Sequence, residues 1–494
     1  MSKQRIGIAI LAISLLSIFW IVPAQAQAQE GGWSEPYRLS SEAGKASEGF
    51  LVADQYGYVH CFWTEVLFEN GQSILKYARF DGVTWSKPND IYVTGQEINN
   101  ISPVVDQQGI LHIVWTEGLF GRTYYTYAPA NNALSVQNWA KPNRIKIPAR
   151  PGYLRVDSRG IFHIVYINPT EESGVYYVRS EDKGTTWSEP VWLDPDILPD
   201  HIPDSLNFEL DENDGLHAVW YYGTRERNAR PDWVRYTHSL DGGHTWSKPF
   251  LIDKYEEEGE HILESPGPIM IVQGQTVHVI WAAGRFPYRN HSFSTDAGRT
   301  WSAPAQIFGE LHGQAFDDFT VDGSGRVHFF GQIRYPIGIY HAYWDQNRWS
   351  KPSLVYLVAA EDSEVGEAGI GTRVHAHHTH PVVRAGNQLV LTFTDGPADP
   401  NRRLFVMYRN LNDIPPLEIL PTPTPTPTLI PPPSPTPSQL EPTATATATL
   451  VNPAGVQPLE SAPRADSALQ FGLVPVLLLL GGTFLFRLWY KNNS

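Results

Sequence analysis

The sequence predicts an all-β fold: a β-propeller of four-stranded blades, with seven blades expected and six as the alternative. Two short patterns repeat across residues 31–412. The first is Trp-Ser-x-Pro or close to it, and it begins at Trp33, Trp85, Trp139, Trp187, Trp246, Trp301 and Trp349. The second is Asp-x-x-Gly-x-apolar-His or close to it, and its histidines are His60, His112, His163, His217, His278 and His328. Units of about 50 residues that each hold four short strands are typical of propeller blades.

The second repeat shows how the four strands are assigned. Residues 102–106 form its first predicted strand, and a tight turn leads to a second strand at 110–116. A longer loop leads to a third strand at 122–128, and the fourth begins near Trp139. The same reading applied to the other repeats, with a degenerate seventh hairpin at 385–393, gives seven hairpins and hence seven blades.

The two ends of the repeat region predict how the ring closes. The motif at Trp33 precedes the first hairpin, whereas no such motif follows the third strand of the last hairpin, at 404–408. We therefore expect the N-terminal strand to complete the last blade. Closure of this kind removes the exposed sheet edges that two open ends would leave.

The segments outside the repeats predict secretion and a membrane anchor. Residues 1–28 hold a basic start, an apolar run and a small-residue site, as a signal peptide does, with an uncleaved anchor as the alternative. Residues 413–467 form a Pro- and Thr-rich linker that lacks the apolar residues needed to fold. Residues 468–486 are long and apolar enough for a transmembrane helix, and Arg487 and Lys491 predict a cytoplasmic tail at 487–494. The propeller would then face the outside of the cell.

Composition argues against a nucleic-acid partner and rules out an internal disulfide. The formal net charge of the 494 residues is -15, which argues against nucleic acid as a partner, because phosphate binding needs a basic surface. Cys61 is the single cysteine, so the chain can form no internal disulfide, and we expect it to be a small buried apolar residue. No pattern predicts a cofactor.

Three repeats carry a longer motif, Ser-x-Asp-x-Gly-x-Thr-Trp, at residues 180–187, 239–246 and 294–301. This motif resembles the Asp box, or bacterial neuraminidase repeat, of the sialidase superfamily, and we call these three segments the full boxes. The resemblance implies a sialidase-like propeller in which each box joins the third and fourth strands, on the face opposite the active site. The roles expected of the box residues are structural: a turn-holding carboxylate and a packing Trp, at Asp182, Trp187, Asp241, Trp246, Asp296 and Trp301. The repeated histidines are likewise expected to be structural.

The same resemblance implies where a site would lie. The family uses three arginines to hold the substrate carboxylate, a tyrosine nucleophile helped by a glutamate, and an aspartate acid/base. Arg225, Arg285 and Arg334 fall eight, seven and six residues after their blades' histidines, and Arg122 lies in a similar loop. A guanidinium suits bidentate carboxylate binding, although solvated surface arginines are the alternative. The Arg-Ile-Pro motif of the family is absent from the sequence.

Acidic and histidine-rich segments offer further candidates. Acidic residues gather in three loops, one of which contains Asp317 and Asp318. Four histidines lie within residues 375–380, where they could bind a metal or form a partly buried polar strand. Two functions therefore stay open: a surface propeller that binds glycans or proteins through its loop-rich face, and a glycosidase or lyase, in particular an exo-acting sialidase-like hydrolase, on acidic sugars.

Overall fold

The computed structural model describes thirteen stretches of the chain. They are residues 32–118, 122–146, 150–168, 173–197, 200–224, 230–254, 267–283, 288–313, 316–334, 336–345, 347–357, 377–395 and 402–422. No helix in this part of the chain is long and apolar enough to cross a bilayer. The predicted signal peptide, transmembrane segment and cytoplasmic tail, and residues 423–467 of the predicted linker, lie outside it.

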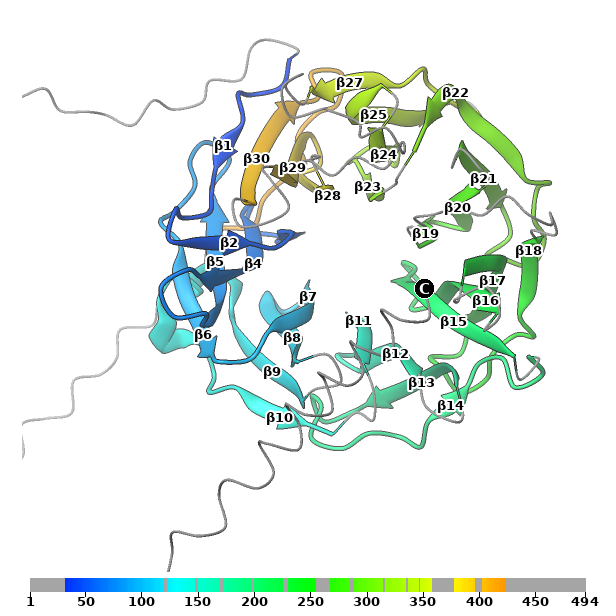
Figure 1. The fold of residues 1–494 in the computed structure, drawn as a ribbon, viewed down its shortest axis with the longest axis horizontal. Helices are drawn as coiled ribbons and strands as arrows, with labels where there is room; N and C mark the ends of the chain where they lie inside the picture. The colour runs from blue at the N-terminus through cyan, green and yellow to red at the C-terminus, as the bar shows by residue number, and fades with distance from the viewer. Residues whose placement is uncertain are drawn as a thin grey trace, which may run out of the picture. The chain divides into compact units, whose positions relative to one another are not determined.

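Seven antiparallel sheets stand around a central axis as the blades of a propeller (Figure 1). Blade 1 contains β2 (Gly44–Ala46), β3 (Phe50–Ala53), β4 (Val59–Leu67), β5 (Ser73–Phe80) and β6 (Asn89–Thr94). Blade 2 contains β7 (Ile98–Val105), β8 (Ile110–Glu117), β9 (Arg122–Pro129) and β10 (Asn143–Ile145), with the short 3-10 helices η1 (Ala130–Asn132) and η2 (Val136–Asn138). Blade 3 contains β11 (Arg150–Val156), β12 (Phe162–Asn168), β13 (Gly174–Ser180) and β14 (Val191–Trp192).

The remaining blades follow the same order from the axis outward. Blade 4 contains β15 (His201–Leu210), β16 (Leu216–Thr224), β17 (Arg230–Ser239) and β18 (Phe250–Lys254). Blade 5 contains β19 (Ile269–Gln273), β20 (Thr276–Ala283), β21 (Tyr288–Ser294) and β22 (Ala305–His312). Blade 6 contains β23 (Asp318–Val321), β24 (Val327–Arg334), β25 (Ile337–Asp345), β26 (Arg348–Trp349) and β27 (Ser353–Tyr356). Blade 7 contains β28 (His377–Arg384), β29 (Gln388–Asp395), β30 (Arg403–Asn410) and, from the start of the chain, β1 (Tyr37–Arg38).

The count of seven blades and the mode of closure are confirmed. β1 pairs with β30, with Tyr37 opposite Val406 and Arg38 opposite Phe405, so the N-terminal strand completes the last blade. The innermost strands of neighbouring blades contact one another around the whole ring, including β28 of blade 7 against β3 of blade 1.

The two ends of the ring differ in their connections. The antiparallel order places the turns between the first and second strands, and those between the third and fourth, at one end, which we call the turn end. The other connections lie at the opposite end, the loop end. The described chain begins and ends at the turn end, because Ser34 donates its backbone N–H to Tyr408 O (2.8 Å) at the end of β30.

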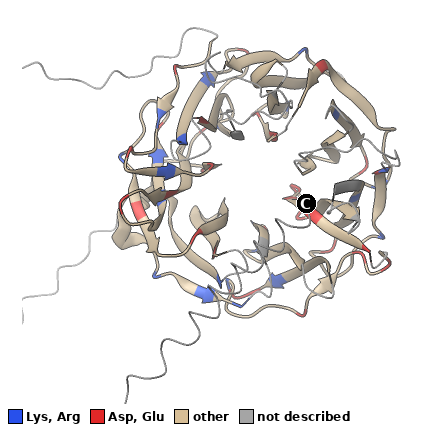
Figure 2. Cartoon of the chain, viewed as in Figure 1, with Lys and Arg blue, Asp and Glu red and all other residues tan. Residues whose placement is uncertain are grey.

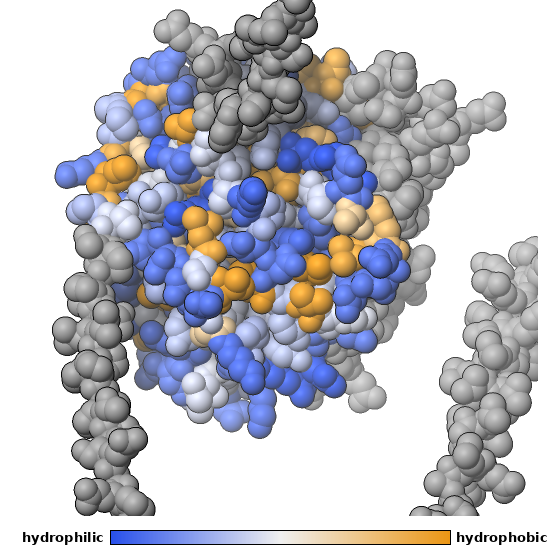
Figure 3. Space-filling model, turned by 90° about the vertical axis from the view of Figure 1, so that its left-hand side faces the viewer, coloured by the Kyte–Doolittle hydropathy of each residue, from blue (hydrophilic) through white to orange (hydrophobic). Residues whose placement is uncertain are grey.

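The chain after β30 makes a second closing contact. Leu411 and Leu417 bond to blade 7 through the carbonyls of Asn387 and Ala385, and Leu420 N–H reaches Gln55 O of blade 1 (2.8 Å). Backbone contacts with the ring therefore continue to Leu420, within the segment 413–467 that the composition predicts as linker. Figure 3 shows one outer side of the ring, where hydrophobic residues are scattered among hydrophilic ones, as on ordinary soluble surfaces.

The repeated tryptophans pack each blade against its predecessor. Trp246 lies edge-on to Tyr177 of blade 3 (centroids 5.0 Å), and Trp301 to Tyr236 of blade 4 (4.7 Å). Trp139 packs in the same way on Tyr77 of blade 1. A buried Trp contributes a large apolar area, so these contacts stabilise the ring.

The full boxes form the turns expected from their residue types. Asp241 Oδ1 accepts the N–H of Thr245 (2.9 Å), and its other oxygen accepts the Thr245 hydroxyl (2.6 Å). Asp182 and Asp296 make the corresponding bonds. These bonds lower the pKa of Asp182 and Asp296 to about 2. For Asp241, slight burial acts in the opposite direction, but the bonds prevail and lower its pKa to about 2 as well.

The repeated histidines are buried in hydrogen-bonded networks at the same level of six blades. His112 bridges Asp106 Oδ2 (3.0 Å) and Tyr125 Oη (2.8 Å), and His60 and His217 have equivalent partners. His328 and His278 bond to a second histidine in place of the tyrosine. Burial lowers the pKa of His278 to about 4, so this side chain is neutral at pH 7.

Candidate functional site

Of the four predicted ligand-binding arginines, Arg122 and Arg334 belong to strands that the structure describes. Arg122 is the exposed first residue of β9, and Arg334 is the last residue of β24. These two lie in blades 2 and 6, with blades 7 and 1 between them on one side and blades 3 to 5 on the other. Arg225 and Arg285 lie outside the described residues.

A nearby arginine of the same loops has a structural position. Arg289 of β21 is fully buried, and its guanidinium forms a two-bond ion pair with Asp317 (2.9 and 3.0 Å). It also donates to Gln332 O of β24 (2.7 Å). Burial raises the pKa of Asp317, against the opposing effect of Arg289. The pair joins blade 5 to blade 6, so its charges are used within the fold.

The innermost strands carry one position that differs between blades. It lies directly across the ladder from the repeated histidine of the second strand in six blades, and from Val390 in blade 7. Five blades have an apolar or neutral residue there: Val52, Val104, Ile271, Thr320 and Val382. Blades 3 and 4 have Arg155 and Glu209 instead.

Arg155 and Glu209 form an ion pair between neighbouring innermost strands. Arg155 Nη2 lies 2.6 Å from Glu209 Oε1, and Nε lies 3.2 Å from Oε2. The remaining guanidinium nitrogen, Nη1, donates to Leu154 O (3.0 Å). The two side chains are 19% and 26% exposed, so solvent reaches them near the axis although protein surrounds them. Figure 2 shows acidic segments on the innermost strands of blades 4 and 6.

Three further polar side chains belong to this region. Tyr153, two residues before Arg155, lies at a register shift of β11 between Pro151 and Leu154. Its phenol interacts electrostatically with Arg155, Glu209 and Asp318. Asp318, at the start of β23, pairs with His380 of β28 (Oδ2 to Nδ1, 3.0 Å), whose ring stacks on Phe50 of β3 (centroids 4.6 Å). We call Tyr153, Arg155, Glu209, Asp318 and His380 the central cluster.

Burial and neighbouring charges shift the pKa values of three groups in the central cluster. Burial raises the pKa of Tyr153, and the neighbouring carboxylates add to this effect, so the phenol keeps its proton at pH 7. Burial also raises the pKa of Glu209, while Arg155 acts in the opposite direction. For Arg155, burial opposes the charge, but Glu209 more than compensates and the pKa is raised.

The central cluster has the residue types that bind a hydroxyl-rich ligand. Glu209 and Asp318 are hydrogen-bond acceptors, the Tyr153 hydroxyl is a donor, and the rings of Phe50 and His380 offer flat faces. No group of three or more potential metal ligands occurs among the described residues. His375 lies outside the described part of the chain.

Only part of this cluster was predicted from the sequence. Asp318 and His380 stood in segments noted as acidic or histidine-rich, but Tyr153, Arg155 and Glu209 were missed. A signal was present for two of them: Arg155 and Glu209 lie two residues before the aspartate of their repeats, as Val104 does before Asp106. Alignment of the repeats with one another would have shown charges where valine is usual.

Comparison with known proteins finds similarity in structure alone. No protein-family model matches the sequence, and no curated protein matches it. A polysaccharide lyase, an ulvan lyase bound to -[GlcA(1-4)Rha3S]-, superposes with a TM-score of 0.50 at 12% identity, covering 77% of this chain and 98% of that one. The shared feature is the fold.

Two other solved structures superpose less closely. A protein of unknown function from Dyadobacter fermentans gives a TM-score of 0.46 at 15% identity, covering 76% of this chain and 98% of that one. The NanB sialidase of Streptococcus pneumoniae gives 0.40 at 10% identity, covering 77% and 70%. Among the structures compared, these propellers thus include sialidases and polysaccharide lyases.

Proposed function

We propose that this protein binds carbohydrate chains at the centre of its propeller ring. The observation that carries the proposal is the replacement of an apolar position by Arg155 and Glu209 on adjacent innermost strands. A repeat that exists only to build a ring has no need of these charges, because the other five blades close without them. The charges therefore point to a ligand.

The chemistry of the central cluster favours a sugar over a protein partner. Partly buried carboxylates bind sugar hydroxyls well, and aromatic faces pack against the C–H groups of a sugar ring. Protein-binding surfaces are larger and rely on exposed aromatic anchors. The ulvan lyase that shares the fold is itself bound to a saccharide, which supports this choice as an analogy of fold.

The second candidate is catalysis on acidic sugars. A tyrosine, a glutamate, an aspartate and an arginine meet in the central cluster, and these are the residue types of the sialidase site. Two observations rank it below binding. The raised pKa of Tyr153 opposes its use as a nucleophile, and Arg155 is already held by Glu209. A protonated phenol near the His380–Asp318 pair is better suited to proton transfer, as a lyase requires.

We also propose that the propeller is displayed on the cell surface through residues 468–486. Both ends of the described chain emerge at the turn end, so a tether there would leave the loop end accessible. Labelling of intact cells with a membrane-impermeant amine reagent should modify exposed lysines such as Lys87. Labelling only after lysis would contradict this placement.

Titration calorimetry with neutral and uronate oligosaccharides of equal length tests the binding site. Tyr153→Phe and Asp318→Asn should each weaken binding about tenfold, since a lost hydrogen bond to a charged or buried group is worth about 1.5 kcal/mol. Tyr127→Phe and Asp90→Asn, on outer strands, are the matched controls. Equal affinity in all four variants would refute the site. Release of an unsaturated product would establish the lyase, and release of a reducing sugar the hydrolase.

A further inference from the structure

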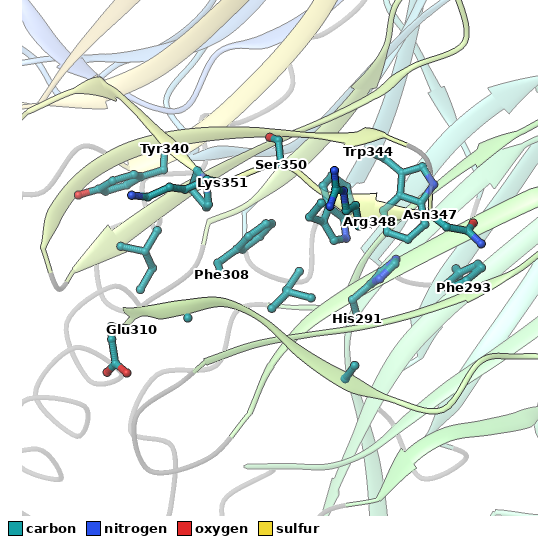
Figure 4. A pocket seen from close by; sticks show the side chains of 16 residues that line it. His291, Phe293, Phe308, Glu310, Tyr340, Trp344, Asn347, Arg348, Ser350 and Lys351 are labelled. Atoms are coloured by element: carbon teal, nitrogen blue, oxygen red, sulfur yellow. The ribbon is translucent and has the colours of Figure 1, made fainter.

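A pocket of about 880 Å³ lies between the outer strands of blades 5 and 6, away from the central cluster. One wall is β22, and the other consists of residues from β25 to the start of β27 (Figure 4). Five aromatic side chains line it, namely Phe293, Phe308, Tyr340, Trp344 and Trp349. A pocket of this size can hold two or more sugar rings.

Both walls depart from the repeat. The turn before Trp349 is one residue shorter than in the full boxes, and β26 pairs directly back onto β25, with Trp344 opposite Trp349. Opposite this turn, the register of β22 shifts so that residues 308–311 bulge from the sheet. Phe308 lies in the left-handed region (φ 64°), which is costly for a bulky residue. Bulges and strained residues of this kind are often found at binding sites.

The pocket combines aromatic faces with free positive charge. The rings of Phe308 and Trp349 lie 5.7 Å apart and those of Trp344 and Trp349 5.4 Å apart. Arg348 and Lys351 stand exposed at its rim, and no described residue forms an ion pair or a side-chain hydrogen bond with either. Glu310 is the single acidic residue among those that line the pocket.

We infer that this pocket is a second carbohydrate site, which binds a carboxylate- or sulfate-bearing segment of a sugar chain. The aromatic faces would pack against the sugar rings, while Arg348 and Lys351 would bind the acidic group. The inference rests on the proposed carbohydrate function. It adds a preference for acidic sugars, which the central cluster does not have because it carries carboxylates. A polymer long enough to reach both sites would gain affinity from the linkage.

The full-length protein in detergent provides the test, with sulfated and neutral oligosaccharides of equal length as probes. Arg348→Gln/Lys351→Gln should weaken binding of the sulfated probe at least tenfold and leave the neutral probe unchanged. Lys87→Gln/Arg144→Gln is the control, because Lys87 holds the same place in its Trp-Ser-Lys-Pro motif and both residues are exposed on other blades. The preference should also shrink at high salt, which screens exposed charges.

Two results would overturn the inference. One is equal affinity of the two double variants for the sulfated probe. The other is a concentration-dependent dimer that only Arg348→Gln/Lys351→Gln dissociates, since a second copy would then fill the pocket. Failure of the central site is a separate result, because it appears as unchanged binding of the neutral probe in Asp318→Asn. Phe308→Ala supplies a variant without charge change, and it should weaken both acidic and neutral ligands at the pocket.

Discussion

At the turn end, six blades bury the same histidine, whereas the innermost position opposite that histidine carries a charge in only two blades. The buried histidines bond to near neighbours in their own blade. Arg155 and Glu209, in contrast, satisfy each other across two blades and remain open to solvent. In a repeat protein, what all repeats share builds the ring, and what a few repeats change is the better guide to binding.

The first test of this distinction between shared and variable positions is to remove a packing tryptophan. Trp246→Ala should cost about 4 kcal/mol, because Trp truncation in a packed site leaves a large cavity beside Tyr177. Carbohydrate binding at temperatures where the variant stays folded should be unchanged, since Trp246 packs on Tyr177 of a third strand, away from the innermost strands that hold the central cluster. Urea unfolding and calorimetric titration measure the two effects. Loss of binding in a stable Trp246→Ala protein would show that the site lies at the outer strands and not on the innermost ones.

The second prediction concerns the charges at the centre. Glu209→Val should cost about 3 kcal/mol, because Arg155 would be left without its partner in a partly buried position. The double variant Arg155→Val/Glu209→Val copies the valine of other blades and should recover that stability. It should nevertheless lose carbohydrate binding. A double variant that binds normally would mean that the pair is only structural.

The third prediction uses pH. His278 has a pKa lowered to about 4 by burial, against 6.5 for the free side chain, so the unfolded chain takes up its proton first as the pH falls. Stability is then fully present above pH 6.5 and is lost between pH 6.5 and 4, by about 2 kcal/mol at pH 5 from this residue alone. His278→Asn should flatten the dependence of the urea midpoint on pH in this window. Substitution of the exposed His244 to Gln should leave the dependence in place.

The smallest expected effect is that of Asp241→Ala. Its carboxylate holds the Thr245 bonds in an exposed turn, so the loss should be about 1 kcal/mol, comparable to removal of a helix cap. Thermal unfolding should shift by a few degrees, and binding should stay unchanged. A loss of binding without a loss of stability would place the binding site at the full boxes and not on the innermost strands.

The ring could be predicted from the sequence because its determinants are local and repeated. Each Trp-Ser-x-Pro and each Asp-x-x-Gly turn specifies a short hairpin, and the orphan motif at Trp33 specifies the closing strand. The centre could not be predicted in the same way, because Arg155 and Glu209 lie 54 residues apart and meet only once two blades stand side by side. An arginine near a loop is also an ambiguous signal, because Arg289, four residues after Arg285, uses its charge within the fold.

The pairing of β1 with β30 places the beginning and the end of the described chain in one sheet, with both exits on the same side. A force that pulls these two exits apart would first detach residues 411–420 from blades 7 and 1 and would then break the hydrogen bonds between β1 and β30 one after another. A force on one exit alone would be shared with the rest of blade 7 through β29 and β28. The ring should thus resist a force applied through a single attachment point. It should unfold most readily when its two ends are pulled apart.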